Sequence, residues 1–135
     1  MNTIEQKFEK VMLIDDNNID LYVNAQVIAR SNFSKEVLQY SSASKALEYL
    51  TTSAEDRSLP EVIFVDIYMP GMSGFEFMEA YDQLSAAIKE HCCVYIISSS
   101  IDKQDIDRAQ ADSNVIAFHQ KPLSKALLET ISKCG

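Results

Sequence analysis

Four short apolar runs of this sequence each end on residues that can do chemistry. In chain order, the residues at or just after the ends of these runs are Asp15, Asp16, Asp66, Ser98 and the pair Lys121-Pro122. Crowded carboxylates repel one another unless a hard cation neutralises them, and oxygen ligands of this kind favour Mg²⁺. A metal beside a carboxylate, a lysine and a hydroxyl suits phosphoryl transfer, which depends on positioning and charge neutralisation.

The apolar runs, rich in valine and isoleucine, predict strands that are buried on both faces, as in a parallel sheet. The predicted strands cover 11–14, 36–40, 62–65, 94–97 and 115–118. The predicted helices cover 18–30, 43–51, 74–89, 102–110 and 124–133, with N-caps at Ser42, Ser73, Asp102 and Ser124. Five strands alternating with five helices predict a doubly wound α/β sheet with right-handed crossovers.

In open parallel sheets, ligand sites form beyond the carboxyl ends of the strands. The predicted sheet therefore brings the acids, the hydroxyl and the lysine to one edge. Each residue taken singly also has a structural explanation, because an aspartate or serine after a strand is often a helix cap or a turn former. The functional interpretation depends on all of them arriving in order, each at the end of a buried run.

Composition bounds the class of protein. The chain has 135 residues, enough for one domain with a real core, and its formal net charge of -8 argues against a dominant nucleic-acid surface. Its three cysteines, Cys92, Cys93 and Cys134, form neither a disulfide framework nor a zinc spacing, so reduced thiols are expected. The sequence shows no secretory signal and no apolar run long enough to span a bilayer, which predicts a cytoplasmic protein without membrane insertion.

The ordered motifs closely resemble the receiver domain of two-component response regulators, over about residues 10–133. The matching motifs are "LIDD" (13–16), "VDIYMPGMSG" (65–74), "YIISSS" (95–100) and "QKPL" (120–123). The resemblance implies a flavodoxin-like (βα)5 fold. It also implies a phosphorylation-dependent signalling module rather than an enzyme acting on a separate substrate, and one domain over residues 1–135.

The resemblance assigns the chemistry to particular positions. Asp66 would accept a phosphoryl group from a phosphohistidine on a sensor histidine kinase or a phosphotransfer protein. The expected cofactor is Mg²⁺ (or Mn²⁺), held by Asp15, Asp16, Asp66 and the backbone carbonyl of Tyr68. Pro70, Gly71 and Gly74 are expected to shape the loop that brings this carbonyl to the metal.

Further roles follow from the same resemblance. Ser98 would bind the phosphoryl oxygens, and Lys121 would pair with Asp66 and then with the phosphoryl group. A cis peptide before Pro122 would aim Lys121 into the site. Phe118 matches an aromatic switch position, although it lacks the hydroxyl of the tyrosine often found there.

Two positions are expected to tune the lifetime of the acyl phosphate. Tyr68 stands two residues after Asp66, and Ser100 stands two residues after Ser98. A bulky tyrosine would shield the acyl phosphate from water and slow self-dephosphorylation; alternatively, its ring points to solvent and has no effect.

The helix predicted over 18–30 carries two apolar stripes. One stripe must face the sheet, and the other either docks a partner helix or is covered within the domain. The stripes are Ile19, Val23 and Val27 on one side and Leu21, Ala25 and Ile28 on the other.

Two other functions compete with the receiver interpretation. A Mg²⁺-dependent aspartyl phosphatase or phosphotransferase typically places a second acid two residues after its nucleophile, where this chain has Tyr68. A pseudo-receiver would lack an acid or the lysine, and neither is missing here. A dinucleotide-binding fold is disfavoured because the three glycines form no phosphate loop.

Because the chain ends after the last predicted helix, we expect no output domain and no direct nucleic-acid contact, unless the chain is a receiver excised from a larger protein.

Overall fold

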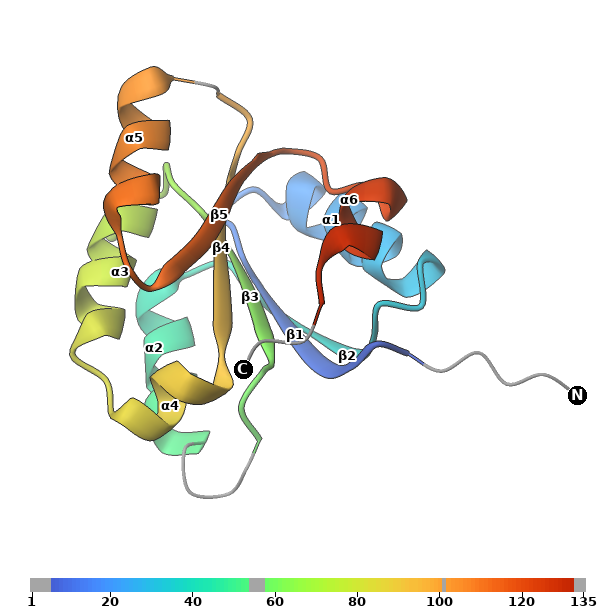
Figure 1. The fold of residues 1–135 in the computed structure, drawn as a ribbon, viewed down its shortest axis with the longest axis horizontal. Helices are drawn as coiled ribbons and strands as arrows, with labels where there is room; N and C mark the ends of the chain where they lie inside the picture. Colours follow the sequence, from blue (N-terminus) through green and yellow to red (C-terminus); the bar gives the residue numbers. More distant parts are fainter. Residues whose placement is uncertain (1–5, 54–57, 101, 133–135) are drawn as a thin grey trace, which may run out of the picture.

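The computed structural model of the chain describes residues 6–53, 58–100 and 102–132. Its elements follow one another as β1 (Phe8–Ile14), α1 (Asn18–Arg30), β2 (Ser34–Tyr40), α2 (Ala43–Ser53), β3 (Val62–Asp66), α3 (Gly74–Asp82), α4 (Ala86–His91), β4 (Cys93–Ser98), α5 (Lys103–Ala111), β5 (Val115–Gln120) and α6 (Lys125–Thr130). The five strands are parallel and form one sheet in the order β2-β1-β3-β4-β5. The predicted α/β fold is confirmed (Figure 1).

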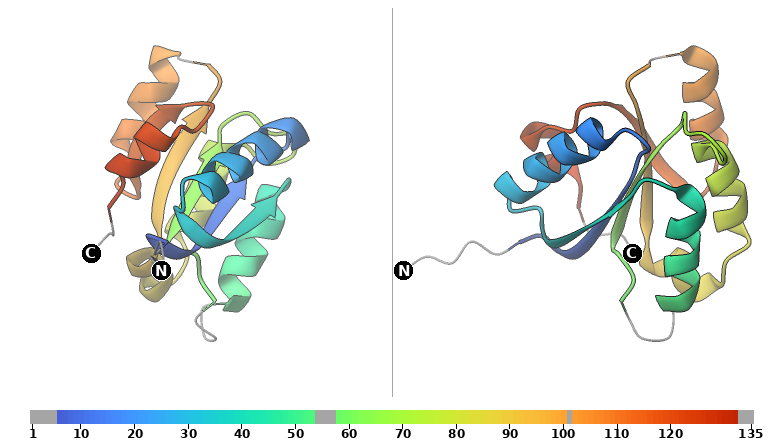
Figure 2. Two further views of the ribbon diagram at one scale, coloured as in Figure 1. Left: turned by 90° about the vertical axis from the view of Figure 1, so that its right-hand side faces the viewer. Right: turned by 180° about the vertical axis from the view of Figure 1, so that it is seen from behind.

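Helices cover both faces of the sheet. Figures 1 and 2 show α2, α3, α4 and α5 on one face and α1 with α6 on the other. Two separate apolar clusters fill the spaces between these layers. The central strand β3 is buried along its whole length, which explains why its sequence is a continuous apolar run that ends on Asp66.

Four of the described helices, α1, α3, α5 and α6, begin at a residue whose side chain caps the first turn, whereas Ser85 makes no such hydrogen bond at α4. Ser73 and Glu76 form a reciprocal capping box at α3, and Asp102 and Ser124 cap α5 and α6 as predicted. The sequence analysis missed Asn17, whose side chain accepts hydrogen bonds from two backbone N–H groups in the first turn of α1.

One predicted helix is wrong in extent. The stretch 74–89 is not a single helix, because α3 ends at Asp82 and α4 starts again at Ala86, so the described part of the chain has six helices rather than the predicted five. The last helix ends at Thr130, short of the predicted residue 133, which lies outside the described residues.

The two apolar stripes of α1 differ in their burial. Leu21 and Ile28 are buried against the sheet, whereas Ile19 and Tyr22 are 73% and 65% exposed. Val27 of the outer stripe is partly buried against the same core as Leu21. The exposed apolar area is therefore concentrated on the first turns of α1.

The cysteines differ from the expectation. Cys92 is buried and free, but Cys93 is disulfide-bonded, which corrects the prediction that all three thiols are reduced. Cys134 lies outside the described residues. Among the helices of the described residues, none has the length and apolar content that a membrane span requires.

Two glycines shape the loop between β3 and α3 for different reasons. Gly71 has a φ of +82°, a left-handed conformation that disfavours other residues, but an added Cβ there would lie in open space. Gly74 has no room for a side chain, because an added Cβ would overlap the backbone carbonyl of Asp66 and lie 2.9 Å from Ile67 Cα. The backbone at Asp66 is thus packed directly against the start of α3.

These contacts predict unequal effects of two matched substitutions. Gly74→Ala should lower the free energy of unfolding by about 2–3 kcal/mol, because the backbone at the end of β3 must move. Gly71→Ala should cost only about 1 kcal/mol, from the left-handed backbone alone. Urea unfolding of both variants tests this expectation, and equal losses would show that the close approach at Asp66 does not govern the loop.

Candidate functional site

The carboxyl ends of four strands form the site at one edge of the sheet. Asp15 directly follows β1, Asp66 ends β3, Ser98 ends β4, and Lys121 directly follows β5. The parallel register places Asp66 beside Ile97, one residue before Ser98. The predicted convergence of these side chains at a single edge therefore has its basis in the strand order.

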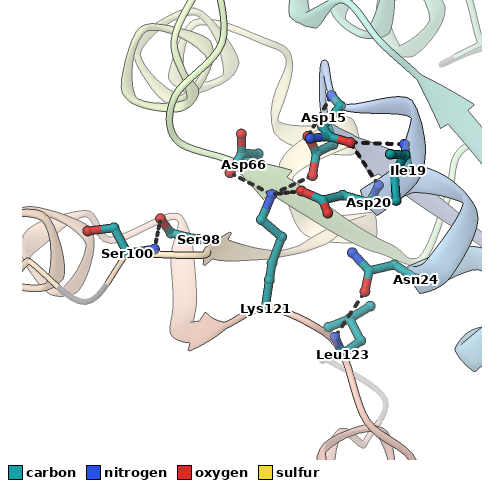
Figure 3. Close-up of polar contacts among 10 residues, drawn as sticks. Asp15, Ile19, Asp20, Asn24, Asp66, Ser98, Ser100, Lys121 and Leu123 are labelled. Carbon is teal, nitrogen blue, oxygen red and sulfur yellow. Dashed lines mark hydrogen bonds and ion pairs between the residues drawn. The ribbon is translucent and has the colours of Figure 1, made fainter.

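The ammonium group of Lys121 is the centre of the polar contacts. Its Nζ lies 2.7 Å from Asp15 Oδ2, 2.8 Å from Asp20 Oδ2 and 3.2 Å from Asp66 Oδ1 (Figure 3). Only 7% of the lysine side chain is exposed, so these ion pairs are largely shielded from water. Burial alone would lower the pKa of Lys121, but the hydrogen bonds to Asp15 and Asp20 raise it above its ordinary value.

The backbone holds both the lysine and its first partner. The Lys121–Pro122 peptide bond is cis, and Lys121 N–H donates to the carbonyl of Ser98 at 2.8 Å. Asp15 Oδ1 accepts a hydrogen bond from Asn17 N–H at 3.0 Å, so one carboxylate oxygen is anchored and the other faces the lysine.

Three carboxylates lie close enough to hold one cation. Asp15, Asp16 and Asp66 each offer an oxygen, and these atoms lie within 4.8 Å of one another. Burial raises the pKa of Asp66 to about 6, the charges of Asp15 and Asp16 act in the same direction, and Lys121 opposes them. The donor set is all oxygen and carries excess negative charge beside one lysine, which fits a hard divalent cation such as Mg²⁺.

Ser98 lies apart from this cluster. Its buried Oγ accepts a hydrogen bond from Ser100 N–H at 3.1 Å, and Figure 3 shows the pair separated from the carboxylates around Lys121. Phe118 on β5 is half-buried and packs against the core beneath α5. It is neither fully inserted nor exposed.

Tyr68 connects the loop after β3 to α5. Its hydroxyl donates a hydrogen bond to the carboxylate of Asp105 in the first turn of α5, and 58% of the residue is exposed. That hydrogen bond raises the pKa of Tyr68. The ring is therefore at the rim of the site and is held by a partner that the sequence analysis did not anticipate.

The sequence analysis also missed two polar residues of α1. Asp20 pairs with Lys121, and buried Asn24, one turn later, accepts a hydrogen bond from Leu123 N–H at 2.9 Å. A cleft of about 290 Å³ adjoins them; it is lined by Asp20, Val23, Asn24, Ser99, Lys121 and Pro122. The spacing of four residues between Asp20 and Asn24 is the only sequence signal that could have placed these two side chains on one helix face.

Comparison with known proteins identifies this arrangement. The family model of the response regulator receiver domain matches residues 11–133. The chain belongs to this family. The matched residues include Asp15, Asp66, Ser98 and Lys121, at the carboxyl ends of the parallel strands.

Individual relatives agree with the family. The two-component response regulator ARR17 of Arabidopsis thaliana is 30% identical over 99% of this chain and 88% of its own length. ORR1 of Oryza sativa subsp. indica is 29% identical over 93% of this chain, but this chain spans only 54% of the length of that protein. A two-component response regulator structure from Cytophaga hutchinsonii has a TM-score of 0.86 and 30% identity, and covers 92% of this chain and 93% of its own.

The raised pKa of Asp66 predicts how stability depends on pH in metal-free protein. The folded state retains a proton on Asp66 that the unfolded chain has already lost near pH 4, so this carboxyl favours folding at low pH. That contribution is lost as the pH rises through about 6. Asp66→Asn should remove this dependence and stabilise the protein at pH 7.5 in EDTA by about 2–3 kcal/mol, at about 1.4 kcal/mol per pKa unit.

Chemical denaturation at pH 4.5 and 7.5 measures this effect. Asp107→Asn removes an exposed carboxylate that pairs with Lys103 on α5, and it should change stability little at either pH. Saturating Mg²⁺ should reduce the advantage of Asp66→Asn, because the cation favours the ionised form. An unchanged pH dependence in Asp66→Asn would contradict the explanation.

Proposed function

We propose that this receiver domain accepts a phosphoryl group onto Asp66 and signals through altered protein contacts. The donor is a phosphohistidine of a sensor histidine kinase or a phosphotransfer protein, and the reaction takes place in the cytoplasm. The observation that carries this proposal is the pairing of a buried carboxylate at the end of β3 with a buried lysine 3.2 Å away, beside two further acids. Family membership supports the donor class.

The proposed step is a single displacement at phosphorus. An oxygen of the Asp66 carboxylate forms a P–O bond as the P–N bond to the donor imidazole breaks, and the imidazole leaves with the bonding electron pair. The product is an aspartyl phosphate, which water later hydrolyses to restore the carboxylate. We expect no other catalytic activity.

The surrounding residues supply charge and position. Asp15, Asp16, Asp66 and the carbonyl of Tyr68 would hold Mg²⁺, which neutralises charge on the phosphoryl oxygens when bound. Lys121 supplies a second positive charge next to Asp66. Ser98 would turn from its present partner, Ser100 N–H, to donate its hydroxyl proton to a phosphoryl oxygen.

The signal would leave the site along β4 and β5. Ser98 ends β4, and half-buried Phe118 pairs in register with Ile96 on that strand, so a turn of Ser98 would free space for the ring to move inward. Exposed Ile19 and Tyr22 on α1 provide apolar area for a protein partner next to the site. The downstream target is another protein.

The competing functions receive less support. An aspartyl phosphatase needs a general acid two residues after the nucleophile, and Tyr68 occupies that position with its hydroxyl engaged by Asp105. A pseudo-receiver would lack a member of the acid and lysine set, whereas all of them are present and close together.

Intact mass spectrometry tests the proposed reaction. Incubation with acetyl phosphate and Mg²⁺ should add one phosphoryl group to the wild type, and neither Asp66→Asn nor an EDTA-treated sample should gain it. Asp107→Asn should react like the wild type. The absence of any adduct, together with failure to bind the phosphoryl mimic beryllofluoride, would identify a pseudo-receiver instead.

The position of Tyr68 predicts a long-lived phosphoprotein. Tyr68 stands two residues after Asp66 in the sequence, and its hydrogen bond to Asp105 holds the ring at the rim of the site. In the Tyr68→Asn variant the acyl phosphate should hydrolyse faster by roughly threefold or more, because water reaches it more easily. Tyr68→Phe keeps the ring but loses the hydrogen bond to Asp105, and should have an intermediate effect. Phosphate release after removal of the donor measures the rates, and an unchanged rate in Tyr68→Asn would rule out shielding.

A further inference from the structure

Asp20 is a fourth acid at the site that the proposed chemistry leaves without a role. Its Oδ2 accepts a hydrogen bond from Lys121 Nζ at 2.8 Å, a shorter contact than that between the lysine and Asp66. It comes from the first turn of α1, whereas Asp15 and Asp66 come from strand ends (Figure 3). Lys121 is therefore shared between the phosphoacceptor edge and a helix.

The ammonium group has no spare donor. Lysine offers three N–H groups, and one carboxylate each from Asp15, Asp20 and Asp66 surrounds them. A phosphoryl group on Asp66 would bring further oxygens that require the same donors. Since Asp15 also belongs to the oxygen cluster that fits a cation, Asp20 is the partner that Lys121 can release.

The protein supports Asp20 as an anion in this position. Its backbone N–H donates to the side chain of Asn17, and the N-terminal end of α1 favours negative charge in the first turn. Its side chain remains 36% exposed, so water can solvate the carboxylate once the lysine leaves. Release of Lys121 does not leave a buried, unpaired charge.

We propose that Asp20 is a competing counter-ion: it holds Lys121 in the resting state and opposes its transfer to the phosphoryl group. This inference rests on the proposed function. Asp20 thereby weakens binding of an anionic phosphoryl group at Asp66 and, as one more nearby negative charge, strengthens binding of the cation. It is a positioning residue for Lys121 and does not touch the reacting atoms.

The charge of Asp20 should affect the binding of beryllofluoride and the binding of Mg²⁺ in opposite directions, which distinguishes an electrostatic role from a structural one. Removing the charge of Asp20 should tighten binding of beryllofluoride at saturating Mg²⁺ on the order of tenfold, because Lys121 becomes free and repulsion falls. The same change should weaken binding of Mg²⁺ alone by several-fold. A folding defect would weaken both ligands.

The experiment compares Asp20→Asn, Asp20→Ala and Asp20→Glu by isothermal titration with Mg²⁺ alone and then with beryllofluoride at saturating Mg²⁺. Asn and Ala should both tighten beryllofluoride binding and weaken Mg²⁺ binding, and Glu, which retains the charge, should stay near the wild type. Asp107→Asn, the same charge change on α5, should alter both affinities by less than twofold. Thermal unfolding checks that each variant is folded.

The outcomes separate this inference from the proposed function. If the wild type binds Mg²⁺ but neither binds beryllofluoride nor forms the Asp66 adduct, the proposed function and this inference both fail. If the wild type does both, and the Asp20 variants leave the affinities unchanged or weaken both, only this inference is overturned. Weaker beryllofluoride binding in Asp20→Ala, with Asp20→Asn unchanged, would show that Asp20 acts by geometry rather than by charge.

Discussion

The ion pairs of one buried ammonium group organise the functional edge of this protein. Lys121 reaches carboxylates from β1, β3 and α1, so a single side chain from the end of β5 joins three other elements. A buried charge is tolerated only when its partners are close, and here each partner also needs the lysine because the acids repel one another. The lysine and the carboxylates consequently stabilise one another, and adding charge to the site, as a bound cation or a phosphoryl group would, changes the balance among all of them.

The scaffold packs this edge unevenly, tightly around Asp66 and less tightly around Phe118. β3 is fully buried, and Gly74 brings α3 into direct contact with the carbonyl of Asp66, so the backbone at Asp66 has little room to move. Ser98 is buried at the end of the interior strand β4, whereas Phe118 lies on the edge strand β5 and is only half-buried. Tyr68 links the loop after β3 to α5 through Asp105, which gives that helix a direct contact with the rim of the site.

The sequence predicts the strands and the polar edge because both depend on simple patterns. A buried parallel strand is a continuous apolar run, and parallel order brings the residues after such runs together. The break between α3 and α4 carries no such signal: no glycine or proline lies between Asp82 and Ala86, and the chain restarts at Ser85 without a side-chain cap. The contact between Asp20 and Lys121 could not be predicted from the sequence either, because the helix dipole favours an acid in a first helical turn whatever else that acid contacts.

Borohydride trapping is the decisive test of whether Asp66 carries the phosphoryl group. Protein treated with acetyl phosphate and Mg²⁺ is reduced with sodium borohydride, which converts an aspartyl phosphate to homoserine, and is then digested and sequenced by tandem mass spectrometry. We expect homoserine at position 66 alone, and none when EDTA is present. Homoserine at Asp15, Asp16 or Asp20 instead, or no homoserine at any position, would contradict this expectation.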